Sequence, residues 1–272
     1  MTVLEQISFV TTPVRVGQVT LRTADEETRM AFRSMDADDQ PVDVLTQSRA
    51  RHVRREEIVA VRENTAERLR VTFIEDVNSV ETNGDTERTV GPLAGRTFEV
   101  ERKSDQAVIA VFEANGAPAR FGVAAQVAGQ YRQFGRTRPQ RPEVPVGPQK
   151  VGQTSRELAE ALIAGVARGA TITSVESAVA TLVEITSGPD DALHGLYSIE
   201  IKVTGASGGS KVTMNLAGTL ILRNFDGAML EVRLKGSVAS TPDAGPDGQV
   251  DVKMPSGAGE FKLTQTMVYA QA

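Results

Sequence analysis

The sequence predicts an α+β fold built mainly from antiparallel β-strands, arranged as a tandem repeat of curved β-meanders with about one helix in each half. Three observations lead to this prediction. Long stretches alternate apolar and polar residues, two short motifs recur in the same order, and a proline-rich segment separates the halves. Alternation over many residues is typical of an antiparallel sheet that packs on one face and meets water on the other.

Three stretches show the alternation clearly. They are RLRVTFIEDV at 68–77, LYSIEIKVTG at 196–205 and EFKLTQTMVYA at 260–270. In the first stretch, Leu69 and Val71 fall on one side and their polar neighbours fall on the other. Side chains on a strand point to opposite faces in turn, so each stretch predicts a strand with one buried face.

Two motifs predict an internal duplication. The hexapeptide PVRVGQ at 13–18 returns as PQKVGQ at 148–153, and Leu-Ala-Gly occurs at 93–95 and again at 216–218. Each Leu-Ala-Gly precedes a strand-forming run, a turn and a second such run. We therefore expect each Leu-Ala-Gly to be a turn that starts a hairpin, and each half to be one copy of the repeat.

The segment RTRPQRPEVPVGPQK holds four prolines, which interrupt helices and central strands. We predict a first β-rich repeat over 1–136, a proline-rich linker over 137–150 and a second β-rich repeat over 151–272. Whether the two repeats share one sheet is not fixed by the sequence.

One helix is expected on each side of the linker. Apolar residues recur at helical spacing from Phe121 to Tyr131. After the linker, TSRELAEALIAGVARG predicts a helix that Thr154 or Ser155 caps and Gly169 ends.

Composition excludes several classes of function. The 272 residues contain no cysteine, which removes disulfides, thiolate metal sites and cysteine nucleophiles. A net charge of −5, only 4% aromatic residues and no tryptophan disfavour nucleic-acid binding. No apolar run is long enough to predict a transmembrane helix, and the chain as given starts without a recognisable signal peptide.

No set of residues predicts catalysis. Gly205-Ala206-Ser207-Gly208-Gly209 fits the G-x-S-x-G pattern, but it lies between two alternating stretches and predicts a hairpin loop. His52 stands in a charged stretch and is expected to be solvated, and His194 follows Asp190 and Asp191 at an expected turn. A weak metal site at that turn is the less favoured interpretation, because no further ligands can be identified. We predict a non-enzyme without catalytic residues, metal or cofactor.

Two functions remain. The first is a structural or assembly protein that contacts an unknown protein or its own copies. The second is a carrier that holds an apolar small molecule or lipid in the concave face of the sheets. The partner-binding residues predicted for the first are Arg132, Arg136, Arg138 and Arg141. The ligand-lining residues predicted for the second, which core packing would equally explain, are Phe73, Phe98, Ile109, Ile199, Ile201, Ile221 and Leu230.

The order of motifs resembles a loosely defined family. Val16-Gly17-Gln18, the stretch GPLAGRTFEV at 91–100 and Val151-Gly152-Gln153 are similar to features of uncharacterised bacterial cell-envelope proteins, often lipoproteins, built from two β-rich halves. The resemblance implies a β-rich fold and an envelope or periplasmic location, and it carries over no catalytic residue. The chain as given departs from the pattern in lacking a signal peptide and a lipid-bearing cysteine, so a cytoplasmic location is the alternative.

Overall fold

The computed structural model describes residues 4–10, 13–35, 40–63, 65–102, 109–131, 134, 147–166, 171–188, 192–207, 210–225, 227–242 and 256–270. The strands, in chain order, are β1 (Gln6–Ser8), β2 (Val19–Met35), β3 (Pro41–Arg62), β4 (Thr65–Thr82), β5 (Asp85–Val90), β6 (Thr97–Glu101), β7 (Ala110–Glu113), β8 (Pro148–Lys150), β9 (Thr154–Ser155), β10 (Thr171–Ser187), β11 (Leu193–Ser207), β12 (Ser210–Arg223), β13 (Met229–Pro242) and β14 (Ser256–Ala270). The helices within the described residues are α1 (Phe121–Gln130) and α2 (Arg156–Val166).

Strands from both halves of the chain form one 12-stranded sheet. Its order is β7-β6-β4-β3-β2-β14-β13-β12-β11-β10-β9, with β5 paired to the remaining part of β4. The described pairs are antiparallel, so the mainly antiparallel β class is confirmed. The halves join where β2 pairs with β14, from Val19 opposite Ala270 to Arg33 opposite Ser256. A second, two-stranded sheet pairs β1 with β8, and β8 falls at the end of the predicted linker.

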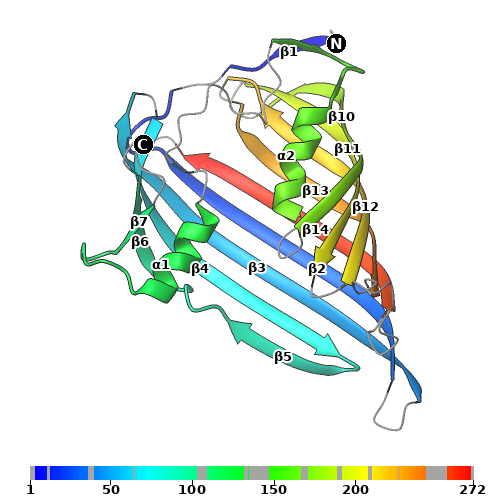
Figure 1. Cartoon of the computed structure of the whole chain (residues 1–272). Helices are drawn as coiled ribbons and strands as arrows, with labels where there is room; N and C mark the ends of the chain where they lie inside the picture. Colours follow the sequence, from blue (N-terminus) through cyan, green and yellow to red (C-terminus); the bar gives the residue numbers. More distant parts are fainter. Residues whose placement is uncertain are drawn as a thin grey trace.

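Figure 1 shows the sheet curved, with both helices on its concave side. The α1 helix contacts β7, and the α2 helix contacts β10 and β11. Ser155 caps α2 as expected, because its hydroxyl accepts a hydrogen bond from the Leu158 N–H at 3.2 Å. Neither described helix is long and apolar enough to cross a membrane.

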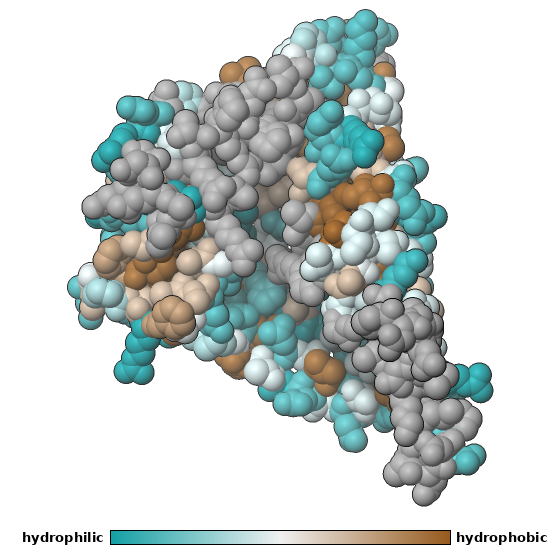
Figure 2. Space-filling view, in the orientation of Figure 1, coloured by the Kyte–Doolittle hydropathy of each residue, from teal (hydrophilic) through white to brown (hydrophobic). Residues whose placement is uncertain are grey.

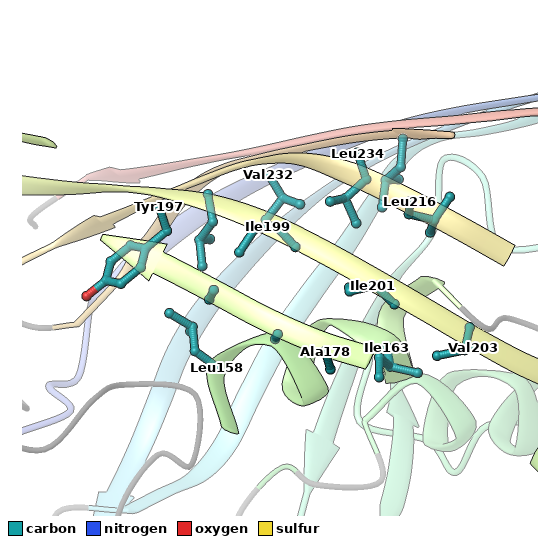
Figure 3. Close-up of a cluster of buried hydrophobic side chains, with 14 of the residues drawn as sticks. Leu158, Ile163, Ala178, Tyr197, Ile199, Ile201, Val203, Leu216, Val232 and Leu234 are labelled. Carbon is teal, nitrogen blue, oxygen red and sulfur yellow. The ribbon is translucent and has the colours of Figure 1, made fainter. Parts of the chain in front are cut away.

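Each helix covers its own hydrophobic core. The larger core, under α2, joins Leu158 and Ile163 of the helix to inward-facing residues of β10–β14, including Ile199 and Leu234 (Figure 3). The smaller core, under α1, joins Val127 to residues of β4, β6 and β7. Their separation leaves the inner face of β2 and β3 between two apolar clusters.

The two V-G-Q motifs form the same turn. Gln18 N–H donates to the Arg15 carbonyl at 3.3 Å, and Gln153 N–H donates to that of Lys150 at 2.9 Å. The glycine of each motif is at the third position of its turn, where a type II turn requires a positive φ. Its φ is 84° for Gly17 and 87° for Gly152. Each turn docks on the neighbouring strand through two backbone bonds, to Ile58 in the first case and to Leu182 in the second.

The first Leu-Ala-Gly motif forms this turn as well, as expected. Arg96 N–H donates to the Leu93 carbonyl at 3.1 Å, Gly95 has φ of 75°, and both residues bond the backbone of Phe73. The second Leu-Ala-Gly does not. Residues 216–218 lie in the interior of β12, where Leu216 is buried and Gly218 stands opposite Ile199 and Leu234. The predicted turn at 216–218 was therefore wrong, because this copy is already paired on both sides.

A diagonal of glycines accounts for the curvature near β13. Gly218, Gly236 and Gly259 lie on the inner face of β12, β13 and β14, each two residues further along the register than the last. A Cβ at any of the three would collide with a backbone carbonyl of the adjacent strand. Glycine permits that close approach, and a line of such positions bends a sheet.

Candidate functional site

The predicted ligand-lining residues fall into both cores. Phe73 and Phe98 are buried under α1, with ring centres 6.0 Å apart and ring planes at 72°, and Ile109 packs against the same cluster. Ile199 and Ile201 are buried under α2. All five therefore pack against the protein's own side chains, and their ligand-binding role stays a prediction.

The other two predicted lining residues lie elsewhere. Ile221 is half-buried and alternates with the buried Leu220 and Leu222, so it points to the opposite face of β12. Leu230 is the extra residue where the register between β12 and β13 shifts, because Ile221 pairs with Glu231 and Leu222 pairs with Met229. The structure thus brings neither into the inner-face cores. The four arginines predicted to bind a partner, Arg132, Arg136, Arg138 and Arg141, lie outside the described residues.

A groove separates the two helices on the concave side. Figure 2 shows this face hollowed between two apolar lobes, with hydrophilic residues at the bottom. The floor includes the inner face of β2, which carries the buried Thr20, Ala24 and Met30 and, by alternation, Arg22 and Glu26.

The same face of β3 follows from its register with β2. Thr20 stands opposite Glu56, Arg22 opposite Arg54, and Ala24 opposite His52. The charged run RHVRREE therefore places every second residue inside the groove, and its alternate residues outside. The charged stretch in which His52 was expected to be solvated therefore supplies the polar floor of the groove.

Glu56 is the centre of this floor. Its carboxylate accepts hydrogen bonds from Arg22 Nε at 2.9 Å and from the Tyr131 hydroxyl at 2.8 Å, and pairs with Arg54 Nε at 2.9 Å. The Glu56 side chain is 9% exposed, whereas those of Arg54 and Arg22 are 24% and 35% exposed. A buried carboxylate is thus saturated by three donors, and its two arginines still reach the groove.

Residues at the end of α1 complete the polar cluster around Glu56. Gln130 accepts a hydrogen bond from Arg54 Nη1 at 2.8 Å, and the Arg54 guanidinium lies 5.3 Å from the centre of the Tyr131 ring. Tyr131 ends α1 and is buried. The polar cluster therefore attaches the helix to the sheet at the edge of the groove.

Charge interactions fix the protonation states. Burial acts to raise the pKa of Glu56, but the positive charges of Arg22 and Arg54 and the Tyr131 hydrogen bond outweigh it, so the pKa is lowered. Burial acts to lower the pKa of Arg22, and Glu56 outweighs it in the same way. Burial, reinforced by the Glu56 carboxylate, raises the pKa of Tyr131. At neutral pH the site holds fixed charges and a neutral phenol, which suits binding and supplies no proton-transfer pair.

A second polar pair lies beside this cluster. His52 Nδ1 is 2.9 Å from Asp76 Oδ1, and both side chains are partly buried. The sequence predicted a solvated His52. The structure instead places His52 on the groove floor, paired with Asp76. His194, expected at a turn, lies inside β11 opposite Thr186 and Arg223. In the described ranges, no three histidine, aspartate or glutamate side chains gather as a metal site.

The hairpin loop predicted at Ser207 agrees with the pairing of β11 and β12. Ser207 and Ser210 are paired at the facing ends of β11 and β12. No helix follows this serine, because residue 210 already begins β12. The geometry of a nucleophile elbow, which needs a strand followed by a helix, is therefore absent at this position.

The outer face of the same strands carries neutralised charges. Arg51 bonds Asp25 at 2.8 Å and Glu75 at 3.0 Å, and Arg70 bonds Glu99 at 2.9 Å. These ion pairs are exposed, and such pairs contribute little to stability or binding. The two faces therefore differ in kind, because the inner arginines share a buried carboxylate and the outer arginines have exposed partners.

Comparison with known proteins assigns no family. No family model matches the chain, and no curated protein matches it. Among solved structures, one of lipid–protein interactions in lipovitellin is similar with a TM-score of 0.40 and 9% identity, over 95% of this chain and 26% of that chain. The chain thus spans about a quarter of the lipovitellin chain.

Two further structures are similar at lower scores. One is an outer membrane channel from Pseudomonas putida F1, with a TM-score of 0.29 and 8% identity over 94% of this chain and 97% of that chain. The other is DynF from the dynemicin pathway of Micromonospora chersina, with a TM-score of 0.20 and 11% identity over 96% and 88% of the two chains. Likenesses this low assign no function.

Proposed function

We propose that the protein is a non-enzymatic binding protein that holds an amphipathic small molecule in the groove between α1 and α2. The observation that carries the proposal is the composition of the concave face, where a charged floor on β2 and β3 lies between two apolar lobes. A ligand with one polar end and one apolar part matches both surfaces at once, and specificity in such sites comes from a few placed polar groups.

The architecture supports binding rather than catalysis. The floor of the groove belongs to one continuous sheet, and each helix beside the groove is attached to that sheet through a packed core. Arg22 and Arg54 share the carboxylate of Glu56, and His52 is paired with Asp76. A nucleophile beside a base is not found among the described floor residues. The non-enzyme prediction therefore belongs to this proposal.

A second candidate function is assembly through a sheet edge. The β10 strand runs from Thr171 to Ser187, but β9 pairs only with Ala180 and Thr181. In the described part of the chain, residues 171–179 have a strand partner on one side alone. Register shifts next to Ile172 and Val175 distort this edge, and bulges of that kind discourage strand addition. The edge is therefore the weaker candidate.

We also propose that the two halves arose by duplication and that the protein lies in the cell envelope. The matching turns at Gly17 and Gly152 support duplication, whereas the different structures of the two Leu-Ala-Gly motifs do not. The location rests on the sequence resemblance alone. Fractionation of the host with an antibody against this chain tests it, since recovery in the cytoplasmic fraction would contradict an envelope address.

Native mass spectrometry of protein purified from its own host tests the proposed function. We expect a species carrying a discrete additional mass that denaturation releases, because a groove ligand is held without a covalent bond. A bare monomer at the mass of the chain would contradict the carrier function. A bare oligomer of defined stoichiometry would contradict it as well and would support assembly.

A further inference from the structure

The groove floor carries one acidic side chain without a partner. Glu26 extends from the inner face of β2, opposite the buried Leu263 of β14 and opposite Ala50 of β3. It is half-buried, and among the described residues no hydrogen bond or ion pair involves its carboxylate. Because partial burial makes an unpaired charge costly, a cation supplied from outside would be stabilised at this position.

The charges of the floor nearly balance as a whole. The two arginines, Arg22 and Arg54, share the carboxylate of Glu56, and the remaining carboxylates are those of Asp76 and Glu26. Two positive charges thus stand against three negative ones, so the total selects neither a simple anion nor a simple cation strongly. The distribution of the charges along the strand is therefore the informative feature.

Arg22 offers a positive group on the same face of the same strand. Its described hydrogen bond runs from Nε to Glu56, so its two terminal nitrogens are not engaged by that carboxylate. Its side chain is partly exposed although it extends from the inner face of a central strand, which places the exposed part in the groove. A guanidinium edge of this kind binds an oxyanion through two parallel hydrogen bonds.

The spacing of these two groups limits the ligand. Arg22 and Glu26 are separated by four residues of strand, which places their Cα atoms about 13 Å apart. Ala24, the one residue between them on this face, is small and buried. Contacts of about 3–4 Å at each end leave roughly 5–7 Å between the ligand's own charges, the length of a spacer of a few carbon atoms.

The inner face changes from polar to apolar in one direction only. Toward the start of β2 it stays polar, with Thr20 opposite Glu56. In the other direction Thr28 follows Glu26, and beyond it Phe32 of β2 stands opposite Val44 of β3. Both of these apolar side chains are half-buried, so they present accessible surface. An apolar tail on this floor would therefore leave from the Glu26 end.

From this order we infer that the groove binds a zwitterionic amphiphile whose cation adjoins its tail and whose anion lies at the far end of its head. The oxyanion contacts Arg22, the ammonium group contacts Glu26, and the tail runs toward Phe32. The inference rests on the proposed function and names its ligand class. Each part of such a ligand meets complementary chemistry, whereas a ligand with one charge leaves one of the two protein groups unpaired.

Calorimetric titration with four ligands of the same twelve-carbon tail tests the inference, each below its micelle-forming concentration. Dodecyl sulfobetaine has the predicted order, with a sulfonate three carbons beyond the ammonium group. Dodecylphosphocholine has the reverse order, dodecyltrimethylammonium has the cation alone, and dodecanoate has the anion alone. We expect the sulfobetaine to bind at least about tenfold more tightly than each of the others, because it alone pairs both groups in the right order.

The other outcomes each remove a part of the inference. Equal affinity for the sulfobetaine and the phosphocholine would overturn the order of the charges. Equal affinity for the sulfobetaine and either singly charged ligand would overturn the role of the charge that this ligand lacks.

Two variants separate recognition from folding. Glu26→Gln should weaken sulfobetaine binding about tenfold and tighten dodecanoate binding, because it removes a negative charge near the anion. Arg22→Gln should also weaken sulfobetaine binding about tenfold, and it should tighten binding of dodecyltrimethylammonium. Opposite changes within one variant cannot arise from loss of folding. A change in the same direction for both ligands of a variant would contradict the assigned contact.

The matched control is Glu27→Gln, which removes the next carboxylate along β2 from the outer face, where it accepts a hydrogen bond from Arg29 at 3.2 Å. Sulfobetaine affinity should be unchanged in this variant, and a loss equal to that of Glu26→Gln would contradict recognition inside the groove. Failure of all four ligands to bind the unmodified protein would contradict the proposed function itself. Binding of all four with equal affinity would contradict the inference alone.

Discussion

The hydroxyl of Tyr131, at the end of α1, donates a 2.8 Å hydrogen bond to the buried carboxylate of Glu56 on β3. This bond joins a short helix to the centre of a large sheet. It also completes the set of donors that keeps Glu56 ionised between Arg22 and Arg54. The helix position and the charge of the groove floor therefore depend on the same two residues.

Removing that hydroxyl should destabilise the protein. We expect Tyr131→Phe to lower the free energy of unfolding by about 2 kcal/mol, since the lost hydrogen bond has a charged, buried acceptor. Chemical denaturation followed by circular dichroism measures the change. The matched control is Tyr197→Phe, because the Tyr197 hydroxyl is equally buried but has no hydrogen-bond partner among the described residues. That change should be neutral or stabilising, and equal losses in the two variants would contradict the assigned bond.

Glu56 should give the stability a specific acid dependence. Its pKa is lowered from the ordinary value of 4.5, so the unfolded chain takes up this proton at a higher pH than the folded protein does. The stability that the ionised group contributes is therefore complete above pH 4.5 and is lost as the pH falls through the folded pKa. The difference in unfolding free energy between the wild type and Glu56→Gln should shrink below pH 4.5. A difference that stayed constant down to pH 3 would show that the carboxylate is not held as described.

The glycine diagonal should tolerate no side chain. Gly236→Ala should cost about 2–3 kcal/mol, because the new Cβ would meet the Asn215 carbonyl and force β12 and β13 apart. Gly129→Ala is the control, since a Cβ there meets nothing within 4 Å and lies in a helix. It should stabilise by up to about 1 kcal/mol. If Gly236→Ala were as stable as the wild type, close approach of the strands would not be the cause of the bend.

Substitution of the glycines in the two V-G-Q turns should destabilise the protein through backbone strain and not through a steric clash. Gly152→Ala should cost about 1 kcal/mol although nothing lies near its Cβ, because φ of 87° is strained for any residue with a side chain. Gly17 has nearly the same φ, 84°, so Gly17→Ala should destabilise the protein by a similar amount. Thermal unfolding of both variants measures this. A neutral effect in both would mean that the turns are not of type II.

The sequence predicted the strands better than the site. Alternation located the strands that carry Leu69, Tyr197 and Phe261, because one face of each is buried and the other is not. The turn predicted for Leu-Ala-Gly at 216–218 was wrong, because a three-residue motif does not determine whether its segment pairs with a strand on each side. The proline-rich segment predicted a boundary, yet β2 and β14 join the halves in one sheet, since long-range strand pairing leaves no local signal.

The groove was missed for a similar reason. The run containing Arg54 and Glu56 is so highly charged that it suggested a solvated face, and only the register with β2 shows which members point inward. One signal was available in the sequence. Tyr131 closes the apolar stripe of α1, and a buried hydroxyl at a helix end needs a polar partner from another element.

A single-tryptophan titration tests the central claim, that a ligand occupies the groove floor, most directly. The chain has no tryptophan of its own, so Thr28→Trp on the inner face of β2 gives one fluorescent reporter in the groove. Thr23→Trp, on the outer face of the same strand, is its control. With oleate as an amphipathic test ligand, the account predicts a saturable change in emission for Thr28→Trp and none for Thr23→Trp. No change in either folded variant, or the same change in both, would contradict a ligand site between α1 and α2.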